Sequence, residues 1–172
     1  KQCLVGSEMC IRDSVWTMPI DKPDQAEIVL ESPDGTWWGP IDWSNDGKHL
    51  LIQNYISITN SKVYLVDLET KDKRLILGNL AEPSVNSGLA FDATNTGVFF
   101  TTDTFAEFNQ LAHKNLVTGE VTIISQDINW DVDGFAISSD GKRAAFKVNE
   151  NGFSALYLLS LIHISEPTRH CL

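Results

Sequence analysis

The sequence predicts an all-β fold, a partial β-propeller, and two observations lead to this prediction. Three similar segments begin 48 and then 46 residues apart: Trp-Ser-Asn-Asp-Gly-Lys at 43–48, Phe-Asp-Ala-Thr-Asn-Thr-Gly at 91–97 and Ile-Ser-Ser-Asp-Gly-Lys at 137–142. A second landmark keeps the same step, because Tyr-Leu-Val-Asp-Leu-Glu-Thr at 64–70 has a counterpart at 112–118 and begins again at 157–159. A period in the forties, built from short β-rich runs and turn residues, is typical of propeller blades.

The repeat predicts two complete four-stranded antiparallel blades and two partial ones. For the first complete blade (39–77) strands are expected at 39–43, 49–54, 62–68 and 73–77, and for the second (87–125) at 87–91, 98–102, 110–116 and 120–124. A preceding partial blade is expected at 15–31, with strands at 15–20 and 26–30. The last one, 133–158, is expected to end after its third strand.

Local patterns justify these strands and the turns between them. The run Val-Tyr-Leu-Val-Asp-Leu at 63–68 is largely apolar on both faces, as expected for a sheet sandwiched between two neighbours. Asn-Asp-Gly at 45–47 and Asp-Gly at 140–141 supply the residues that adopt positive φ angles in tight hairpins.

The two ends, 1–14 and 159–172, do not continue the repeat. Codons can be chosen so that the DNA encoding residues 4–13, read on its opposite strand, encodes residues 160–168. No folding constraint produces this relation. Both ends are therefore interpreted as non-native tails derived from a sequencing-library adaptor, and 15–158 is expected to be the natural segment, cut at both ends.

Composition limits the possible partners of the segment 15–158. Cys3, Cys10 and Cys171 all lie in the two ends, so the segment has no disulfide framework and no thiolate metal site. The formal net charge of the chain is −10, and an acidic surface argues against nucleic-acid binding, which needs Lys and Arg. No apolar run is long enough to span a bilayer. We expect neither a nucleic-acid nor a membrane partner, and the sequence leaves open a cytoplasmic or an exported location in a bacterium.

Four stretches resemble the N-terminal β-propeller of bacterial prolyl-oligopeptidase-family (S9-type) serine peptidases. They are Gly-Pro-Ile-Asp-Trp-Ser-Asn-Asp-Gly-Lys at 39–48, the blade end at 63–70, Thr-Thr-Asp-Thr-Phe-Ala-Glu-Phe-Asn-Gln-Leu-Ala at 101–112 and Ile-Asn-Trp-Asp-Val-Asp-Gly at 128–134. Residues 146–152 and 156–158 are similar to the next blade of the same domain. The blade core is shared with TolB-type propellers, whereas the segments at 103–110 and 129–134 favour the peptidases.

The resemblance implies a non-catalytic cap that gates the access of peptides to a Ser-Asp-His site. That site would belong to a separate C-terminal α/β-hydrolase domain of the same chain, and the parent would be similar to dipeptidyl, acylaminoacyl or prolyl oligopeptidases. The sequence has no Gly-x-Ser-x-Gly nucleophile motif, and Gly-Phe-Ser-Ala at 152–155 lacks the second glycine. We therefore expect no catalytic, cofactor-binding or metal-ligating residues in this chain, and no cofactor.

His49 and His113 are the histidines of the segment 15–158. His49 precedes an expected strand, and His113 lies within one. Each is interpreted as a surface or edge imidazole rather than as the base of a catalytic triad.

A calcium-loop spacing is also present. Asn129, Asp131, Asp133 and Gly134, with Asp140 in the twelfth position, match the positions of oxygen ligands in such loops. A calcium loop needs flanking helices and usually a final Glu. Residues 134–137 are instead expected to form the first strand of a blade, with the last aspartate in its hairpin turn.

The tryptophans and several loop carboxylates also permit functional interpretations. Trp37, Trp38, Trp43 and Trp130 are compatible with an aromatic shelf for peptide or sugar, but we expect them to fill the wedges between blades. Four acidic residues are compatible with recognition of a substrate amino terminus across the central channel, although solvated loop carboxylates are the preferred interpretation: Glu107, Asp127, Asp131 and Asp133.

Two further functions remain open beside the peptidase cap. The first is a TolB-like propeller that acts as a protein-interaction scaffold without any hydrolase. The second, a hydrolase or lyase with its site in the channel, is disfavoured because the blades present show no catalytic cluster. Several hundred further residues with Gly-x-Ser-x-Gly, then Asp and His, would support the peptidase.

Overall fold

The computed structural model describes residues 14–162 and 170–171. Every regular element in this part is a β-strand, except for the three-residue 3-10 helix η1 (Pro23–Gln25). The predicted all-β fold class is confirmed. In the same described part, no helix is long and apolar enough to cross a membrane. The predicted tails lie mostly outside the described residues, and their origin stays a prediction.

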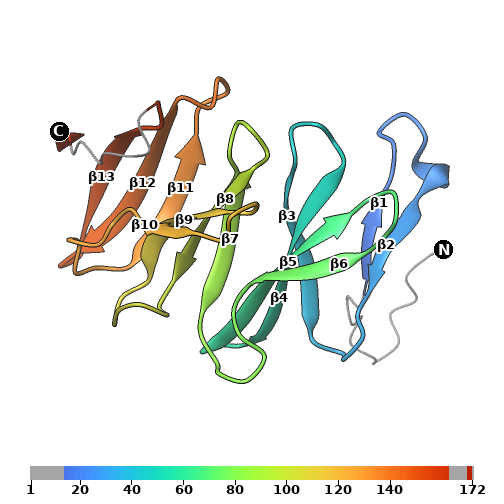
Figure 1. The fold of residues 1–172 in the computed structure, drawn as a ribbon, viewed down its shortest axis with the longest axis horizontal. Helices are drawn as coiled ribbons and strands as arrows, with labels where there is room; N and C mark the ends of the chain where they lie inside the picture. The colour runs from blue at the N-terminus through green and yellow to red at the C-terminus, as the bar shows by residue number, and fades with distance from the viewer. Residues whose placement is uncertain (1–13, 163–169, 172) are drawn as a thin grey trace.

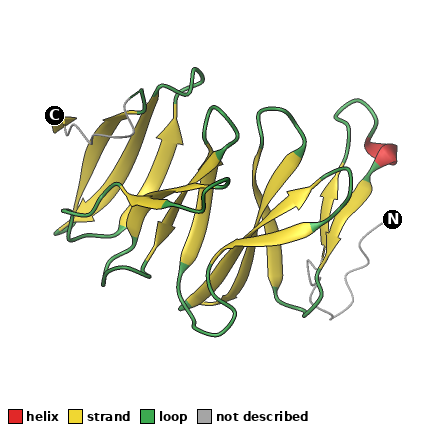
Figure 2. Cartoon of the chain, viewed as in Figure 1, coloured by secondary structure: helices red, strands yellow, loops and turns green. Residues whose placement is uncertain are grey.

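The strands form four antiparallel sheets that follow one another along the chain (Figure 1, Figure 2). The N-terminal partial blade contains β1 (Ser14–Thr17) and β2 (Glu27–Glu31). The first complete blade contains β3 (Trp37–Trp43), β4 (His49–Ser57), β5 (Asn60–Asp67) and β6 (Lys73–Leu77). The second complete blade contains β7 (Asn86–Phe91), β8 (Gly97–Thr102), β9 (Gln110–Asn115) and β10 (Val121–Ile123). The C-terminal sheet contains β11 (Val132–Ile137), β12 (Arg143–Glu150), β13 (Phe153–Ser160) and β14 (His170–Cys171).

The two complete blades are confirmed, whereas the C-terminal sheet differs from its prediction. It was expected to end after a third strand at residue 158, but β13 continues to Ser160. The two-residue strand β14 then pairs with Tyr157 and Leu158. An uncovered strand edge presents unpaired backbone groups, and β14, which lies in the predicted tail, occupies part of that edge.

The repeated hairpins share one geometry but use different residues for it. Gly47 and Gly141 have φ angles of 70° and 66°, as predicted for the turns of the first complete blade and the C-terminal sheet. In the second complete blade the residue with positive φ is Asn95, at 59°. Asparagine tolerates the left-handed region better than most residues, so Gly97, two positions later, is not required by the turn.

Each complete blade buries both of its faces. Leu50, Leu51 and Ile52 are consecutive in β4 and all at most 1% exposed, and successive strand residues point to opposite faces. Leu50 and Ile52 pack in a cluster with the N-terminal partial blade. Leu51 packs in another cluster with the second complete blade, so the prediction of a sandwiched sheet is confirmed.

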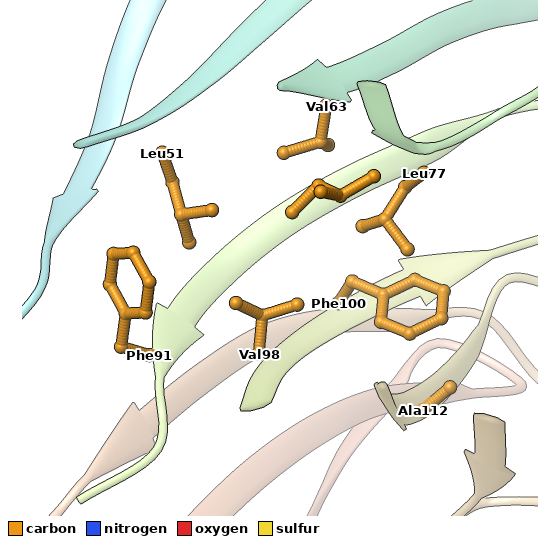
Figure 3. Packing of buried hydrophobic residues seen from close by; sticks show 8 residues of the cluster. Leu51, Val63, Leu77, Phe91, Val98, Phe100 and Ala112 are labelled. Atoms are coloured by element: carbon orange, nitrogen blue, oxygen red, sulfur yellow. The ribbon is translucent and has the colours of Figure 1, made fainter. Parts of the chain in front are cut away.

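The cluster between the two complete blades forms the centre of the described structure (Figure 3). From the first blade Leu51 and Val63 contribute, and from the second blade Phe91 and Phe100. All of these side chains are at most 4% exposed. Burial of large apolar side chains from adjacent sheets is the main stabilising contribution in stacked blades.

Hydrogen bonds fix the relative position of the same two blades. Asp42 Oδ2 accepts a bond from the backbone N–H of Phe91 at 2.9 Å. The Gln53 side chain donates to the carbonyl of Asn86 at 2.6 Å and accepts from the N–H of Gly88 at 3.2 Å. These bonds pair with backbone N–H and C=O groups along the inner strand β7, and they hold this strand beside β3 and β4.

The outer faces of the end sheets are apolar and exposed, and we expect the 172-residue chain to self-associate through them. In β13, Leu156 and Leu158 are 58% and 41% exposed, on a face that a further blade would cover. Leu156→Glu should shift the chain toward the monomer in size-exclusion chromatography with light scattering. Val117→Glu, at an 80% exposed turn position, is the matched control. A wild-type chain that is monomeric and melts cooperatively would contradict this prediction.

Candidate functional site

Two segments that the sequence singles out, 101–112 and 128–134, meet at one place in the structure. The backbone N–H of Asn109 donates to Asp131 Oδ1 at 2.7 Å, and the N–H of Val132 donates to the carbonyl of Asn109 at 3.0 Å. The rings of Phe108 and Trp130 lie beside each other, with centroids 6.4 Å apart. We call this contact, formed by residues 108–109 and 130–132, the loop junction. It links the second complete blade to the C-terminal sheet.

The calcium-loop residues do not come together. Asp131 is in the loop junction, the Asp133 carboxylate lies 3.3 Å from Lys147 Nζ, and Asp140 is in the hairpin beyond the other end of β11. That strand is six residues long and extended, which separates its ends by roughly 17–20 Å. The strand-and-hairpin interpretation is confirmed. In the described ranges, no group of three or more His, Cys, Asp or Glu side chains is arranged to hold a metal ion.

The four carboxylates proposed for recognition of an amino terminus are all exposed: Glu107, Asp127, Asp131 and Asp133. Two of them bind groups of the protein itself, as described above, through a backbone N–H and a lysine ammonium. Asp133 also differs from the expectation of a loop residue, because it lies on the inner strand β11.

The four tryptophans differ in burial, and Trp130 is half-buried against the cluster between the second complete blade and the C-terminal sheet, in agreement with wedge filling. Trp38 is 4% exposed, with its ring 4.9 Å from that of Tyr64 and the Lys73 ammonium 4.8 Å from its centroid. The prediction of wedge filling is correct for this residue. It is wrong for Trp37 and Trp43, which are 46% and 49% exposed at the two ends of β3, where the strand meets the loops and less protein surrounds it.

His113 is buried, contrary to the prediction of a surface or edge imidazole. It is 8% exposed, and its Nε2 lies 3.2 Å from Asp92 Oδ2. The other carboxylate oxygen of Asp92 accepts the backbone N–H groups of Thr94 and Thr96 at 3.0 and 3.1 Å. A carboxylate held in this way orients the imidazole, as in a catalytic triad. The hydroxyls beside this pair belong to threonines that bond to each other at 2.6 Å, which favours a structural role.

Differences between the repeat units could have predicted the Asp92–His113 pair from the sequence. Asp92 takes the place that Ser44 and Ser138 occupy in the other hairpins, and Gly97 takes the place of His49. A Cβ atom on Gly97 would lie 2.2 Å from Nε2 of His113. The glycine therefore provides the space for the imidazole, and both departures from the repeat belong to one buried interaction.

We expect Asp92→Asn to destabilise the chain at neutral pH and to have little effect in acid. Burial is the largest influence on Asp92 and opposes ionisation, but hydrogen bonds from His113 and Thr94 outweigh it, so the pKa of Asp92 lies below its ordinary value. The stabilisation is therefore present above the unfolded pKa of about 3.9 and is lost as the pH falls through the lower folded pKa. Urea unfolding at pH 7 and pH 3 measures this. Asp21→Asn, in an exposed loop, is the control, and an equal loss at both pH values would contradict the expectation.

His49 agrees with its interpretation as an edge imidazole. It begins β4 with its side chain 34% exposed, and its Nε2 lies 3.8 Å from Asp67 Oδ2 at the end of the neighbouring strand β5. At this distance the two atoms are too far apart for a hydrogen bond.

Ser154 does not lie on a nucleophile turn. Gly152 occupies the turn between β12 and β13 with a φ angle of 88°, and the serine is an exposed residue of the extended strand β13. A nucleophile elbow requires a sharp turn from a strand into a helix, whereas the described backbone around Ser154 runs from a hairpin turn into a strand.

Comparison with solved structures shows which proteins share this architecture. A prolyl endopeptidase superposes with a TM-score of 0.72 at 16% identity, over 95% of this chain and 25% of that one. Oligopeptidase B from Trypanosoma brucei gives 0.64 at 17% identity, over 87% and 21%. TolB from Acinetobacter baumannii gives 0.63 at 19% identity, over 87% and 35%. The sequence matches no family model, and no curated protein matches it significantly.

These similarities establish the fold. The four-stranded antiparallel sheets match the β-propeller domains of prolyl oligopeptidases and of TolB. The chain spans between about a fifth and about a third of the length of these three proteins. The residues that the structure describes form blades and contain no α/β-hydrolase domain.

Proposed function

We propose that this chain is part of the substrate-gating propeller of an S9-type serine peptidase whose α/β-hydrolase domain lies outside it. The observation that supports this most is the superposition on a prolyl endopeptidase over 95% of the chain, against 87% for TolB. The loop junction adds to it, because both of its segments belong to the stretches that resemble the peptidase family.

In this proposal the propeller contributes no catalytic group. Its rigid sheets restrict the size of the peptides that reach the Ser-Asp-His site, and the hydrolase domain of the same polypeptide is its partner. Peptide substrates pass through the propeller or beside it. The Asp92–His113 pair then has a structural role in the second complete blade. Both residues are buried, and in the described structure no serine forms a hydrogen bond with either of them.

A TolB-like interaction scaffold is the second candidate. Its support is the match to Acinetobacter baumannii TolB at 19% identity. A scaffold needs only an exposed surface on a stable ring and no hydrolase.

The natural reading frame decides between the two. DNA from the same source should continue past residue 158 into several hundred codons with Gly-x-Ser-x-Gly followed by Asp and His. The protein expressed from that frame should then be labelled by a fluorophosphonate probe, and a variant with the motif serine changed to alanine should not be labelled. A stop codon soon after the ring closes would overturn the peptidase proposal and favour the scaffold.

A further inference from the structure

Every contact between neighbouring sheets of this chain joins the same two kinds of face. We call the face of a sheet that packs on the next sheet along the chain its forward face, and the opposite one its backward face. Between the two complete blades, Leu51 and Val63 lie on a forward face, and Phe91 and Phe100 lie on the backward face that meets them. Three such contacts join the four sheets. In the described structure they leave the forward face of the C-terminal sheet and the backward face of the N-terminal partial blade without a partner sheet, at opposite ends of the row (Figure 1).

The repeat identifies the residues of the uncovered forward face. Leu156 occupies the place in its strand that Val63 and Leu111 occupy in theirs. Val63 and Leu111 are 0% exposed, because each packs in the cluster that its blade shares with the next sheet. Leu156 is 58% exposed, and Leu158, two residues further along the same face, is 41% exposed. These leucines are therefore interface residues whose partner sheet is missing.

The uncovered backward face belongs to β1 and β2. In their register Val15 pairs with Leu30, and Trp16 pairs with Ile28. Val15 and Leu30 pack toward the first complete blade, so Trp16 and Ile28 point to the other side, where they are 56% and 38% exposed. The pairs of β5 and β6 are shifted at the same place, and Tyr64, which has the position of Trp16 there, packs toward the preceding sheet. Trp16 is thus the counterpart of a residue that contacts a forward face.

The charges beside these apolar residues have opposite signs on the two faces. Glu31 points to the backward face, because it follows a residue that points forward. Lys147 pairs directly with Leu156 and lies on the forward face, as does Arg143 in the same strand. Lys147 is already 3.3 Å from Asp133, so Arg143 is the more available cation. A contact between two identical faces would oppose like charges, whereas a forward face on a backward face brings opposite charges together.

We propose that the chain pairs head to tail with a second copy of itself. The forward face of one copy, with Leu156 and Leu158, packs on the backward face of the other, with Trp16 and Ile28. This contact repeats the three that already join the sheets within the chain. Two copies supply twice the four sheets of one chain, and propeller rings contain about 4–8 blades, so a second contact of the same kind would close the pair into a ring. The proposal depends on the sheet faces alone and holds under either proposed function.

The test starts from sedimentation velocity and native mass spectrometry of the 172-residue chain. A reducing agent is present, so that the three cysteines do not form intermolecular disulfides. The wild-type chain should form dimers at micromolar concentration. Trp16→Glu blocks the backward face and Leu156→Glu the forward face. Each should raise the dissociation constant at least about tenfold, because a carboxylate would be buried in an apolar contact.

An equimolar mixture of these two variants determines which faces meet. Trp16→Glu keeps an intact forward face and Leu156→Glu keeps an intact backward face. The mixture should therefore form dimers that contain one copy of each, which native mass spectrometry distinguishes by mass. If two identical faces met instead, one of the variants alone would still dimerise as tightly as the wild-type chain. Far-UV circular dichroism checks that each variant retains its strands, and Trp16→Ser replaces Trp16→Glu if that variant does not.

Ile58→Glu and Val117→Glu are the matched controls, at turn positions that are 83% and 80% exposed and lie on neither end face. Both should dimerise like the wild-type chain. A discrete dimer shows that the ring closes, and a longer series of oligomers shows that it stays open; both support head-to-tail pairing. Three results would overturn it: a monomeric wild-type chain, undiminished dimerisation of Trp16→Glu or Leu156→Glu alone, or a mixture of the two that stays monomeric.

Discussion

Replacing Phe100 by alanine should open the contact between the two complete blades. The side chain is 2% exposed and belongs to the cluster that both blades share (Figure 3). Truncation removes the buried ring and leaves a cavity that rigid sheets fill only in part, at a cost of about 3–5 kcal/mol. Whole domains are stable by only about 5–15 kcal/mol, so this loss is a large part of the total stability. It is the largest effect that we expect from one substitution.

Amide hydrogen exchange measures this effect locally, and self-association of the end sheets does not obscure it. Protection in β4 and β8 should fall by a factor of about 100 to 4,000, since each factor of ten corresponds to about 1.4 kcal/mol. Phe105→Ala is the matched control, because this phenylalanine is 57% exposed in the loop after β8. Equal protection in the two variants would show that the blades do not stack as described.

Gly97→Ala should be the second most damaging change, by about 2–4 kcal/mol. The new Cβ would lie 2.2 Å from His113 Nε2 and 2.6 Å from Asp92 Oδ2. Both atoms are buried, so the imidazole must move and the hydrogen bond between His113 and Asp92 breaks. The left-handed backbone of this hairpin is at Asn95 instead, so the expected loss comes from packing and not from backbone strain.

A double-mutant cycle separates these two causes. In a His113→Ala background the clash with the imidazole is removed, and only the contact with Asp92 Oδ2 at 2.6 Å remains, so Gly97→Ala should cost less than in the wild-type background. The coupling between the two substitutions should be about 2 kcal/mol, measured by urea unfolding or by exchange protection in β8 and β9. Additive effects would rule out the proposed contact.

The sequence alone determined the strands and their grouping into blades. The β6 strand begins and ends at the predicted residues 73 and 77, and the hairpin glycines 47 and 141 have the expected positive φ angles. These features depend on local alternation and on turn chemistry, which a short stretch of chain specifies by itself. The 46–48-residue period also predicts that successive sheets stack face to face, because a sheet that is apolar on both faces needs a neighbour on each side.

Only the tertiary structure decided which side chains of the repeat are buried and which are brought together. From the sequence His113 is an ordinary strand residue. In the structure its imidazole is buried, because Gly97 of the adjacent strand β8 has no side chain and leaves room for it. Trp43 reads as a wedge residue, yet it borders a pocket whose other walls come from residues about 48 and 95 positions further along the chain. Burial and proximity of this kind depend on the packing of whole sheets against each other, and no local pattern of residues specifies that packing.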